Sequence, residues 1–126
     1  MRSKPPMCAT GRFARLLAWL ALAPLAACGG GSEPTVTAVY KYMGSVQCSG
    51  GGGISLATMQ QQLASGGVTV LASSCGTDGK AYVAMCGAPD GAIGIFDVPA
   101  EQADRALSLS FARLSDLPNA ARVACR

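Results

Sequence analysis

Apolar and polar residues alternate along 35–42, and this period of two predicts a half-buried strand that can extend to Cys48. The Gly-rich stretch 49–53 then predicts a loop. Ser55 stands at an N-cap position before apolar residues at helical spacing, and Gly66-Gly67 ends that helix. The first half of this region is therefore expected to form a strand, a loop and a helix.

The second half of the pattern predicts short strands and a further helix. Pro99 opens this helix, because its missing N–H has no intrahelical partner in the first turn, and Glu101 and Arg105 are expected to pair on its outer side. The expected elements, in chain order, are strands over 68–74, 80–86 and 92–97, the helix from 99, a strand over 111–114 and an irregular tail over 115–126, with turns at 75–79 and 88–91.

This order of elements favours an α+β fold. We expect a small antiparallel or mixed sheet of four to five strands, with two helices on one face. The order is similar to the ferredoxin-like βαββαβ arrangement with one additional hairpin strand. The resemblance lies in the topology alone.

The N-terminal segment has a different composition from the rest of the chain. Four basic residues and no acidic residue precede or flank the start of the uncharged run Leu16–Ala27. Twelve helical residues span about 18 Å, which is too short for a hydrocarbon core of about 30 Å. A basic head followed by a short apolar run predicts a secretory signal peptide, with Met1 or Met7 as the start.

The end of this run, Leu25-Ala26-Ala27-Cys28, resembles the lipobox of bacterial lipoproteins. In that family a diacylglycerol is attached to the cysteine thiol and the leader is cut before it. The resemblance implies removal of 1–27 and a bilayer anchor made of acyl chains on Cys28. The alternative is an ordinary secretory signal that ends near a cysteine.

Residues 28–34 join the expected anchor to the head, 35–126, and their glycines make them a flexible tether. In the lipoprotein family an Asp after the cysteine often retains the protein in the inner membrane. Gly29 follows Cys28 here, so the resemblance implies the outer membrane, with the head facing the periplasm.

Removal of the leader changes the charge of the chain from +3 to −1, because six basic and seven acidic residues remain. No basic surface then argues for nucleic acid as a partner. The chain has no His, which excludes the usual catalytic triads and most zinc and copper sites. No catalytic, cofactor-binding or metal-binding residues are predicted.

Four cysteines remain in the head, an even number for an oxidising compartment: Cys48, Cys75, Cys86 and Cys125. Since no C-x-x-C motif and no His accompany them, two structural disulfides are expected rather than a redox or metal site. The predicted strand ends favour Cys48–Cys75 with Cys86–Cys125, and the competing pairing joins Cys75 to Cys86 across a hairpin. Each would stabilise the head by roughly 3–4 kcal/mol.

These observations predict a small non-catalytic lipoprotein of the cell envelope. Its partners would be the bilayer, through Cys28, and an envelope protein or the cell wall. Alternatives are an envelope enzyme inhibitor that exposes the segment 75–86, a minor enzyme without a known motif, and a thiol carrier with an easily reduced disulfide.

Overall fold

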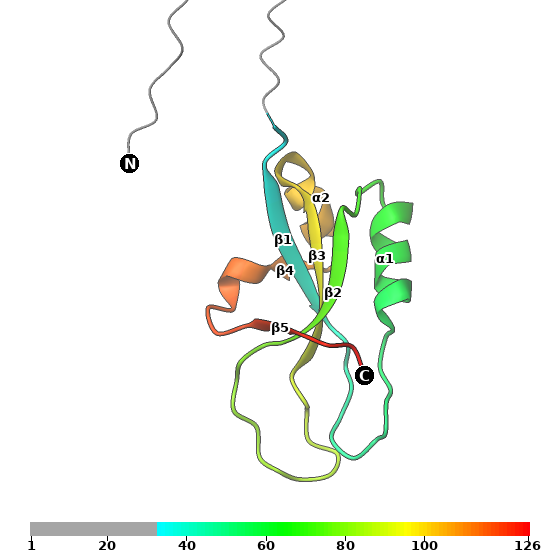
Figure 1. Ribbon diagram of the computed structural model, residues 1–126. Coiled ribbons are helices and arrows are strands. Elements are labelled where there is room, and N and C mark those ends of the chain that lie inside the picture. Colours follow the sequence, from blue (N-terminus) through cyan, green and yellow to red (C-terminus); the bar gives the residue numbers. More distant parts are fainter. Residues whose placement is uncertain (1–32) are drawn as a thin grey trace, which may run out of the picture. The chain divides into compact units, whose positions relative to one another are not determined.

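Five antiparallel strands form one sheet in the order β4-β1-β3-β2-β5 (Figure 1). The computed structural model describes residues 33–126; the predicted signal peptide, Cys28 and most of the tether lie outside them. The strands are β1 (Val36–Tyr42), β2 (Ala72–Thr77), β3 (Ala92–Pro99), β4 (Ala112–Arg113) and β5 (Ala121–Val123). The helices are α1 (Leu56–Ser65) and α2 (Ala103–Ser108), with 3₁₀ turns at Ala100–Gln102 and Leu114–Asp116.

This architecture confirms the expected α+β class, with a purely antiparallel sheet and two disulfides. The elements from β1 to β4 follow the βαββαβ order, and the additional strand is β5 at the end of the chain. Within residues 33–126, no helix is both long and apolar enough to cross a membrane.

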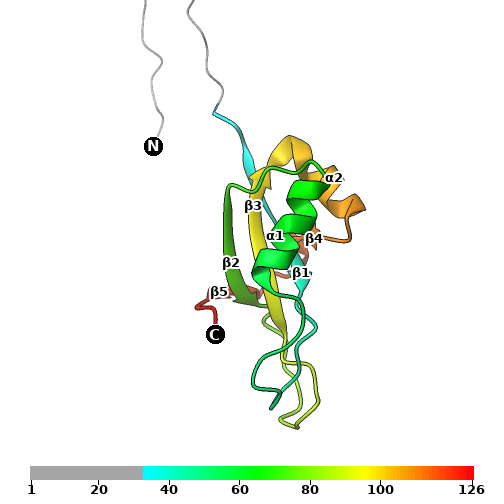
Figure 2. The same ribbon diagram turned by 90° about the vertical axis from the view of Figure 1, so that its right-hand side faces the viewer.

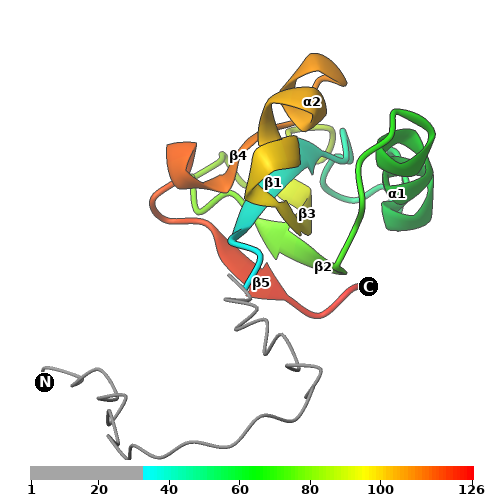
Figure 3. The same cartoon turned by 90° about the horizontal axis from the view of Figure 1, so that it is seen from above.

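One face of the sheet packs against both helices (Figure 3). Met59 and Leu63 of α1 and Ala106 of α2 are buried against the strand residues Val39 and Phe96. Ser55 caps α1 by accepting a hydrogen bond from the Thr58 N–H, and the helix ends at Gly66, as the sequence predicts. These contacts form the larger of two apolar clusters.

The opposite face is covered by the chain that follows β4. Tyr40, Ile93 and Ile95 pack there against Leu117. Gly76 of β2 lies under this segment, where a Cβ atom would come within 2.5 Å of the Ile95 Cδ1 and 2.9 Å of the Ala121 carbonyl oxygen. Leu117 is therefore part of the core and Ala121–Val123 form strand β5, whereas the sequence predicts an irregular tail over 115–126.

The predicted strand over 80–86 is wrong. These residues belong to a long exposed loop between β2 and β3, and no strand of the sheet pairs with them. The Lys80 N–H and the Tyr82 hydroxyl donate to Asp78, and the Val83 carbonyl oxygen accepts from Gln47. The strand predicted over 68–74 lies later, over Ala72–Thr77, so the residues predicted as a turn at 75–79 largely continue β2. Pairing with β3, from Ala72 opposite Asp97 to Thr77 opposite Ala92, sets these bounds.

The expected Glu101–Arg105 pair is not among the ion pairs of residues 33–126. Asp104 pairs with Arg113 instead, at 2.7 Å between Oδ1 and Nη2. Arg122 of β5 reaches across β2 and donates to the Ser74 hydroxyl and the Asp97 carboxylate, each at 2.6 Å. Both ion pairs join different elements, α2 to β4 and β5 to β3, which helical spacing alone does not predict.

The predicted disulfide pairing is also wrong. Cys48 is bonded to Cys86 and Cys75 to Cys125, which is the third of the three pairings that four cysteines allow. The prediction placed Cys48 and Cys75 at the ends of two strands that run parallel on either side of the first helix. In the structure β1 and β2 flank β3, and Cys48 lies beyond the end of β1 in a loop.

Candidate functional site

Two long loops leave the same end of the sheet and lie side by side there (Figures 1 and 2). One loop, 43–54, follows β1; the other, 78–91, joins β2 to β3. We call these two loops together the tip. Because Val36 pairs with Pro99 and Tyr42 with Ile93, the tip lies at the end of the sheet opposite to the one where β1 begins.

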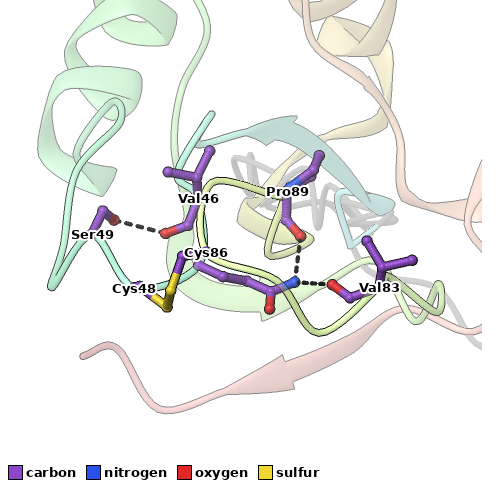
Figure 4. Close-up of a disulfide and its surroundings, with 7 residues drawn as sticks. Val46, Cys48, Ser49, Val83, Cys86 and Pro89 are labelled. Atoms are coloured by element: carbon purple, nitrogen blue, oxygen red, sulfur yellow. Dashed lines mark hydrogen bonds between the residues drawn. A yellow bond between two sulfur atoms is a disulfide. The ribbon is translucent and has the colours of Figure 1, made fainter.

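The Cys48–Cys86 disulfide joins the two loops of the tip (Figure 4). Around this bond, Gln47 donates from its side-chain nitrogen to the carbonyl oxygens of Val83 at 2.8 Å and Pro89 at 3.2 Å. The Gln47 N–H also donates to the Ala88 carbonyl oxygen at 2.9 Å. The disulfide therefore acts together with a set of hydrogen bonds from a single neighbouring residue.

A second link lies closer to the sheet. The Ser45 hydroxyl donates to the Asp90 carboxylate at 2.9 Å, and the Ala92 N–H donates to the same Oδ1 at 3.0 Å. The backbone bond from Ala92, followed by the bond from Ser45, outweighs partial burial and lowers the pKa of Asp90 below its usual value. Asp90 is thus held as a carboxylate at neutral pH.

The base of the 78–91 loop is anchored by Asp78, whose side chain is only 2 % exposed. Its carboxylate accepts hydrogen bonds from the Tyr82 hydroxyl at 2.6 Å, the Tyr42 hydroxyl at 3.0 Å and the Lys80 N–H at 3.0 Å. Gly91 closes the loop with a φ of +72°, and a Cβ there would come within 2.7 Å of the Asp78 Oδ1. The Asp78 carboxylate therefore holds the start of the loop, and the Asp78 N–H, which donates to the Gly91 carbonyl oxygen at 3.0 Å, joins the two ends.

The charges in this cluster stay in their ordinary states at neutral pH. Burial raises the pKa of Asp78, but the hydrogen bonds from Tyr82, the Lys80 amide and Tyr42 outweigh it, so the net pKa is lowered. The bond to Asp78 raises the pKa of Tyr82 to about 12. The Lys80 ammonium donates to the Tyr42 hydroxyl at 3.2 Å, and this bond raises the pKa of Lys80.

The directions of these pKa shifts bear on whether the cluster can act as a general acid or base. A general acid or base works best with a pKa near the operating pH, whereas here the carboxyl pKa falls and the phenol and ammonium pKa values rise. All the Asp78 bonds are also internal to the cluster. The cluster is built to position the loop.

The tip exposes apolar side chains. Val83 and Met85 are 68 % and 63 % exposed, which makes them the two most exposed large apolar side chains of residues 33–126. Val46 of the other loop and Tyr82 are also exposed. Because the loops are cross-linked, these side chains are presented on a fixed frame and not on a free loop.

A groove with a volume of about 1360 Å³ lies beside the tip. Its walls are the Gly-rich loop, the end of β2 and the C-terminal residues that follow β5. Asp90 and Arg126 are the charged residues of its lining, Gln47 contributes an amide, and the other lining residues are apolar, small or hydroxylated. The lining includes the Ser45 hydroxyl, which donates to the Asp90 carboxylate at 2.9 Å, and the Ala92 N–H donates to the same carboxylate oxygen at 3.0 Å.

The sequence-predicted site residues are distributed over the molecule. Cys48 and Cys86 lie in the tip, whereas Cys75 and Cys125 tie the C-terminal residues to β2. The predicted lipidation residue, Cys28, lies outside the described part of the chain. Within 33–126, no group of three or more His, Cys, Asp or Glu residues is placed to hold a metal ion.

The turn expected over 75–79 does not reveal the role of Asp78 as an anchor of the loop. Its main partners, Tyr42 and Tyr82, are 36 and 4 residues away, and no spacing rule connects all three. One signal for the tip was present, because the segment 81–89 is uncharged yet shows no strand alternation.

No protein-family model, curated protein or solved structure matches the chain.

Proposed function

We propose that this chain is a small lipoprotein of the cell envelope, held in the outer membrane by acyl chains on Cys28, with its head in the periplasm. The head is a non-catalytic interaction module, and its contact surface is the tip. The observation that carries this proposal is a rigid, cross-linked pair of loops that exposes Val83 and Met85. Exposed apolar side chains held in one arrangement are typical of binding surfaces.

The direction of β1 supports this use of the tip. The tether joins the head just before Val36, at the end of the sheet opposite to the tip. A head anchored through Cys28 therefore presents the tip on the side farther from the tether. A partner in the periplasm meets this surface first.

The polar groups of the head support a non-catalytic role. The buried carboxylate of Asp78 has its bonds satisfied within the fold, and its pKa is lowered, away from neutrality. The Asp90 carboxylate in the groove is likewise bonded within the fold, by the Ser45 hydroxyl and the Ala92 N–H, and its pKa is also lowered.

Fractionation of cells that express the full chain tests the anchor. Wild-type protein is expected in the membrane fraction after a carbonate wash, and Cys28→Ala protein in the soluble fraction. Cys8→Ala is the matched control, because Cys8 lies within the predicted leader and is removed with it. Retention of the Cys28→Ala protein in washed membranes would contradict acyl anchoring.

Site-specific photo-crosslinking in cells tests the tip as contact surface. A photoreactive amino acid at position 83 is expected to give a discrete cross-linked product. The same group at position 71 is the control, because Leu71 is 50 % exposed and lies just before β2, at the other end of the sheet. Equal products from both positions, or none from position 83, would contradict this role.

A second candidate is an inhibitor of an envelope enzyme, and the same loop favours it. The segment 78–91 is exposed and held at both ends, as the inserted loops of inhibitors are. However, the Met85 N–H donates to the Val83 carbonyl oxygen at 3.0 Å, a tight turn that a protease cleft made for extended chain does not fit. Slow cleavage between Val83 and Met85 by an envelope protease would favour this alternative.

A further inference from the structure

We infer that the Cys48–Cys86 disulfide is a redox site, at which a dithiol reductant exchanges with the bond and thereby loosens the tip. Exchange itself depends only on the two loops, whereas its effect on binding rests on the proposed function. Three features of the described residues carry it: the exposure of both cysteines, the backbone conformation of Cys48 and the hydrogen bonds that remain when the bond opens.

Both cysteines of this bond are exposed, and both lie in loops and not in the sheet (Figure 4). Thiol–disulfide exchange requires a thiolate to reach a sulfur atom, so its rate depends on access. The other disulfide differs, because Cys75 is partly buried within β2, between β3 and β5, and only Cys125 is exposed. Exposed disulfides are the ones that serve as labile or regulatory bonds.

The chain around the two cysteines is uncharged. Residues 43–57 and 81–89 contain no Asp, Glu, Lys or Arg. The charged residues of the tip are Asp78, Lys80 and Asp90, and both carboxylates are occupied by hydrogen bonds from within the fold. An anionic thiolate therefore meets an uncharged stretch of chain on each side of both cysteines.

The backbone conformation of Cys48 favours opening of the bond. Its φ is +65°, in the left-handed region that residues with a Cβ atom rarely adopt. Within residues 33–126, Cys48 and Ser110 are the two residues other than glycine that have a positive φ. Such conformations persist only where the surrounding structure holds them, and they cluster at switch regions. The bond to Cys86 is one of these constraints, and its opening lets Cys48 return to an ordinary conformation.

The two loops stay together when the bond opens, because hydrogen bonds link them independently of the sulfur atoms. The Gln47 N–H donates to the Ala88 carbonyl oxygen at 2.9 Å, and the Gln47 carbonyl oxygen accepts from the Gly87 N–H at 3.1 Å. The Gln47 side chain donates to two further carbonyl oxygens of the same loop. The two thiols therefore remain near each other, and the bond can form again without unfolding of the head.

The two thiols of the reductant balance the exchange. One thiolate of the reductant attacks one of the two sulfur atoms, forms a mixed disulfide and releases the other cysteine as a thiolate. The second thiol of the reductant then displaces the attached cysteine. Two electrons and two protons thus pass to the head, which gains two thiols, and the reductant becomes a disulfide.

Reduction changes the contact surface of the tip. Val83 and Met85 lie in the loop 78–91, which loses its covalent link to the loop 43–54. Side chains on a looser loop cost more conformational entropy to bury. The oxidised head is therefore the form that binds, and the reduced head is the form that releases its partner.

Timed reduction of the folded full chain in mild detergent tests the site, with dithiothreitol as the dithiol and alkylation followed by mass spectrometry as the readout. Cys48 and Cys86 are expected to be alkylated at least about ten-fold faster than Cys75 and Cys125. Equal rates, or faster alkylation of Cys75 and Cys125, would overturn the inference. A rise in amide hydrogen exchange throughout the sheet once Cys48–Cys86 is open would overturn it too, because the head would then unfold.

Two glutamine variants test whether the hydrogen bonds keep the thiols together. When oxidised dithiothreitol replaces the reduced form, Cys48–Cys86 is expected to form about five-fold more slowly in Gln47→Ala than in wild-type protein. Gln102→Ala is the matched control, because the Gln102 amide bonds to Thr69, outside the tip, and its loss should leave the rate unchanged. Equal rates in the two variants would overturn the reversible closure that a switch requires.

The photoreactive group at position 83 separates failure of the inference from failure of the proposed function. In Cys48→Ser/Cys86→Ser, the cross-linked product is expected to fall about ten-fold, whereas Cys75→Ser/Cys125→Ser keeps the bond of the tip and should retain the product. An unchanged product in Cys48→Ser/Cys86→Ser would overturn the inference and leave the proposed function intact. Absence of the product from oxidised wild-type protein would instead contradict the proposed function.

Discussion

Asp78 shows at the scale of one residue how a buried charge is tolerated in this head. It is the one buried charged side chain of residues 33–126, and its carboxylate receives three donors. A buried carboxylate without such donors would be strongly destabilising. Two of the three donors are tyrosine hydroxyls, so the apolar rings cover the ion that their hydroxyls bind.

Replacement of Asp78 by Ala should lower the free energy of unfolding by about 3 kcal/mol, because it removes charge-assisted bonds and leaves two tyrosine hydroxyls without their acceptor. Urea denaturation measures this change. The control is Asp104→Ala, which removes an ion pair whose aspartate side chain is 90 % exposed and should cost less than about 1 kcal/mol. Equal losses in both variants would contradict the anchoring role of Asp78.

Tyr82 should ionise late in an alkaline titration. Its pKa is raised to about 12 by the bond to Asp78, above the unfolded value of about 10. The raised value means that this contribution to stability is present below about pH 10 and is lost as the pH rises towards 12. Near-ultraviolet absorbance during an alkaline titration should show a late step that Tyr82→Phe removes and Tyr42→Phe does not. An ordinary pKa for Tyr82 would rule out the short bond.

At the scale of elements, each disulfide serves a different part of the fold. Cys48–Cys86 joins the two loops of the tip, and Cys75–Cys125 holds the C-terminal residues next to β2. The corresponding sequence separations are 38 and 50 residues. Loop-closure entropy depends only weakly on length, so both bonds should stabilise the head by similar amounts, about 4 kcal/mol.

Removing either disulfide should therefore cost a similar amount of stability, but should loosen a different part of the head. Cys48→Ser/Cys86→Ser should raise amide hydrogen exchange in the tip, whereas Cys75→Ser/Cys125→Ser should raise it in β5 and in the partners of β5 on β2. Hydrogen exchange with peptide resolution distinguishes the two patterns. The same pattern from both variants would show that the tip and the C-terminal segment open as one unit.

The elements that the sequence predicts best are those that depend only on spacing and capping within a single segment. The capping serine of α1, its terminal glycine and the strands β1 and β3 follow from spacing within each element. The loop 78–91 could not be predicted in this way, because its conformation depends on Tyr42 and Cys48, which belong to a distant part of the chain. The composition of Lys80–Cys86 is compatible with a strand, but no partner strand is available to it in the fold.

At the scale of the whole molecule, two layers cover the two faces of one sheet. The helices bury one face, and the segment around Leu117 covers the other. The tip extends beyond both layers at one end of the sheet and has no apolar cluster of its own among the two of the head. It depends on the disulfide and on the carboxylates Asp78 and Asp90 for its structure.

The stability of the molecule should therefore fall in acid. Both aspartates have lowered pKa values in the folded state, relative to about 3.9 in the unfolded chain. Their contribution is fully present above that value and is lost as the pH falls through the lowered folded values. Urea unfolding measured at a series of pH values should show a decline below about pH 4 that is smaller in Asp78→Asn/Asp90→Asn. If stability falls by the same amount in this double variant, the loss of stability in acid is due to other titrating groups.

The fold class, the strands β1 and β3, helix α1 and the presence of two disulfides follow from the sequence alone. The pairing of the cysteines, the start of β2 and the anchoring of the tip by Asp78 follow only from the three-dimensional arrangement of the chain. Periodicity and capping are properties of neighbouring residues, so they can be read along the chain. Pairing and burial depend on distances between remote segments, and these exist only after the sheet has formed.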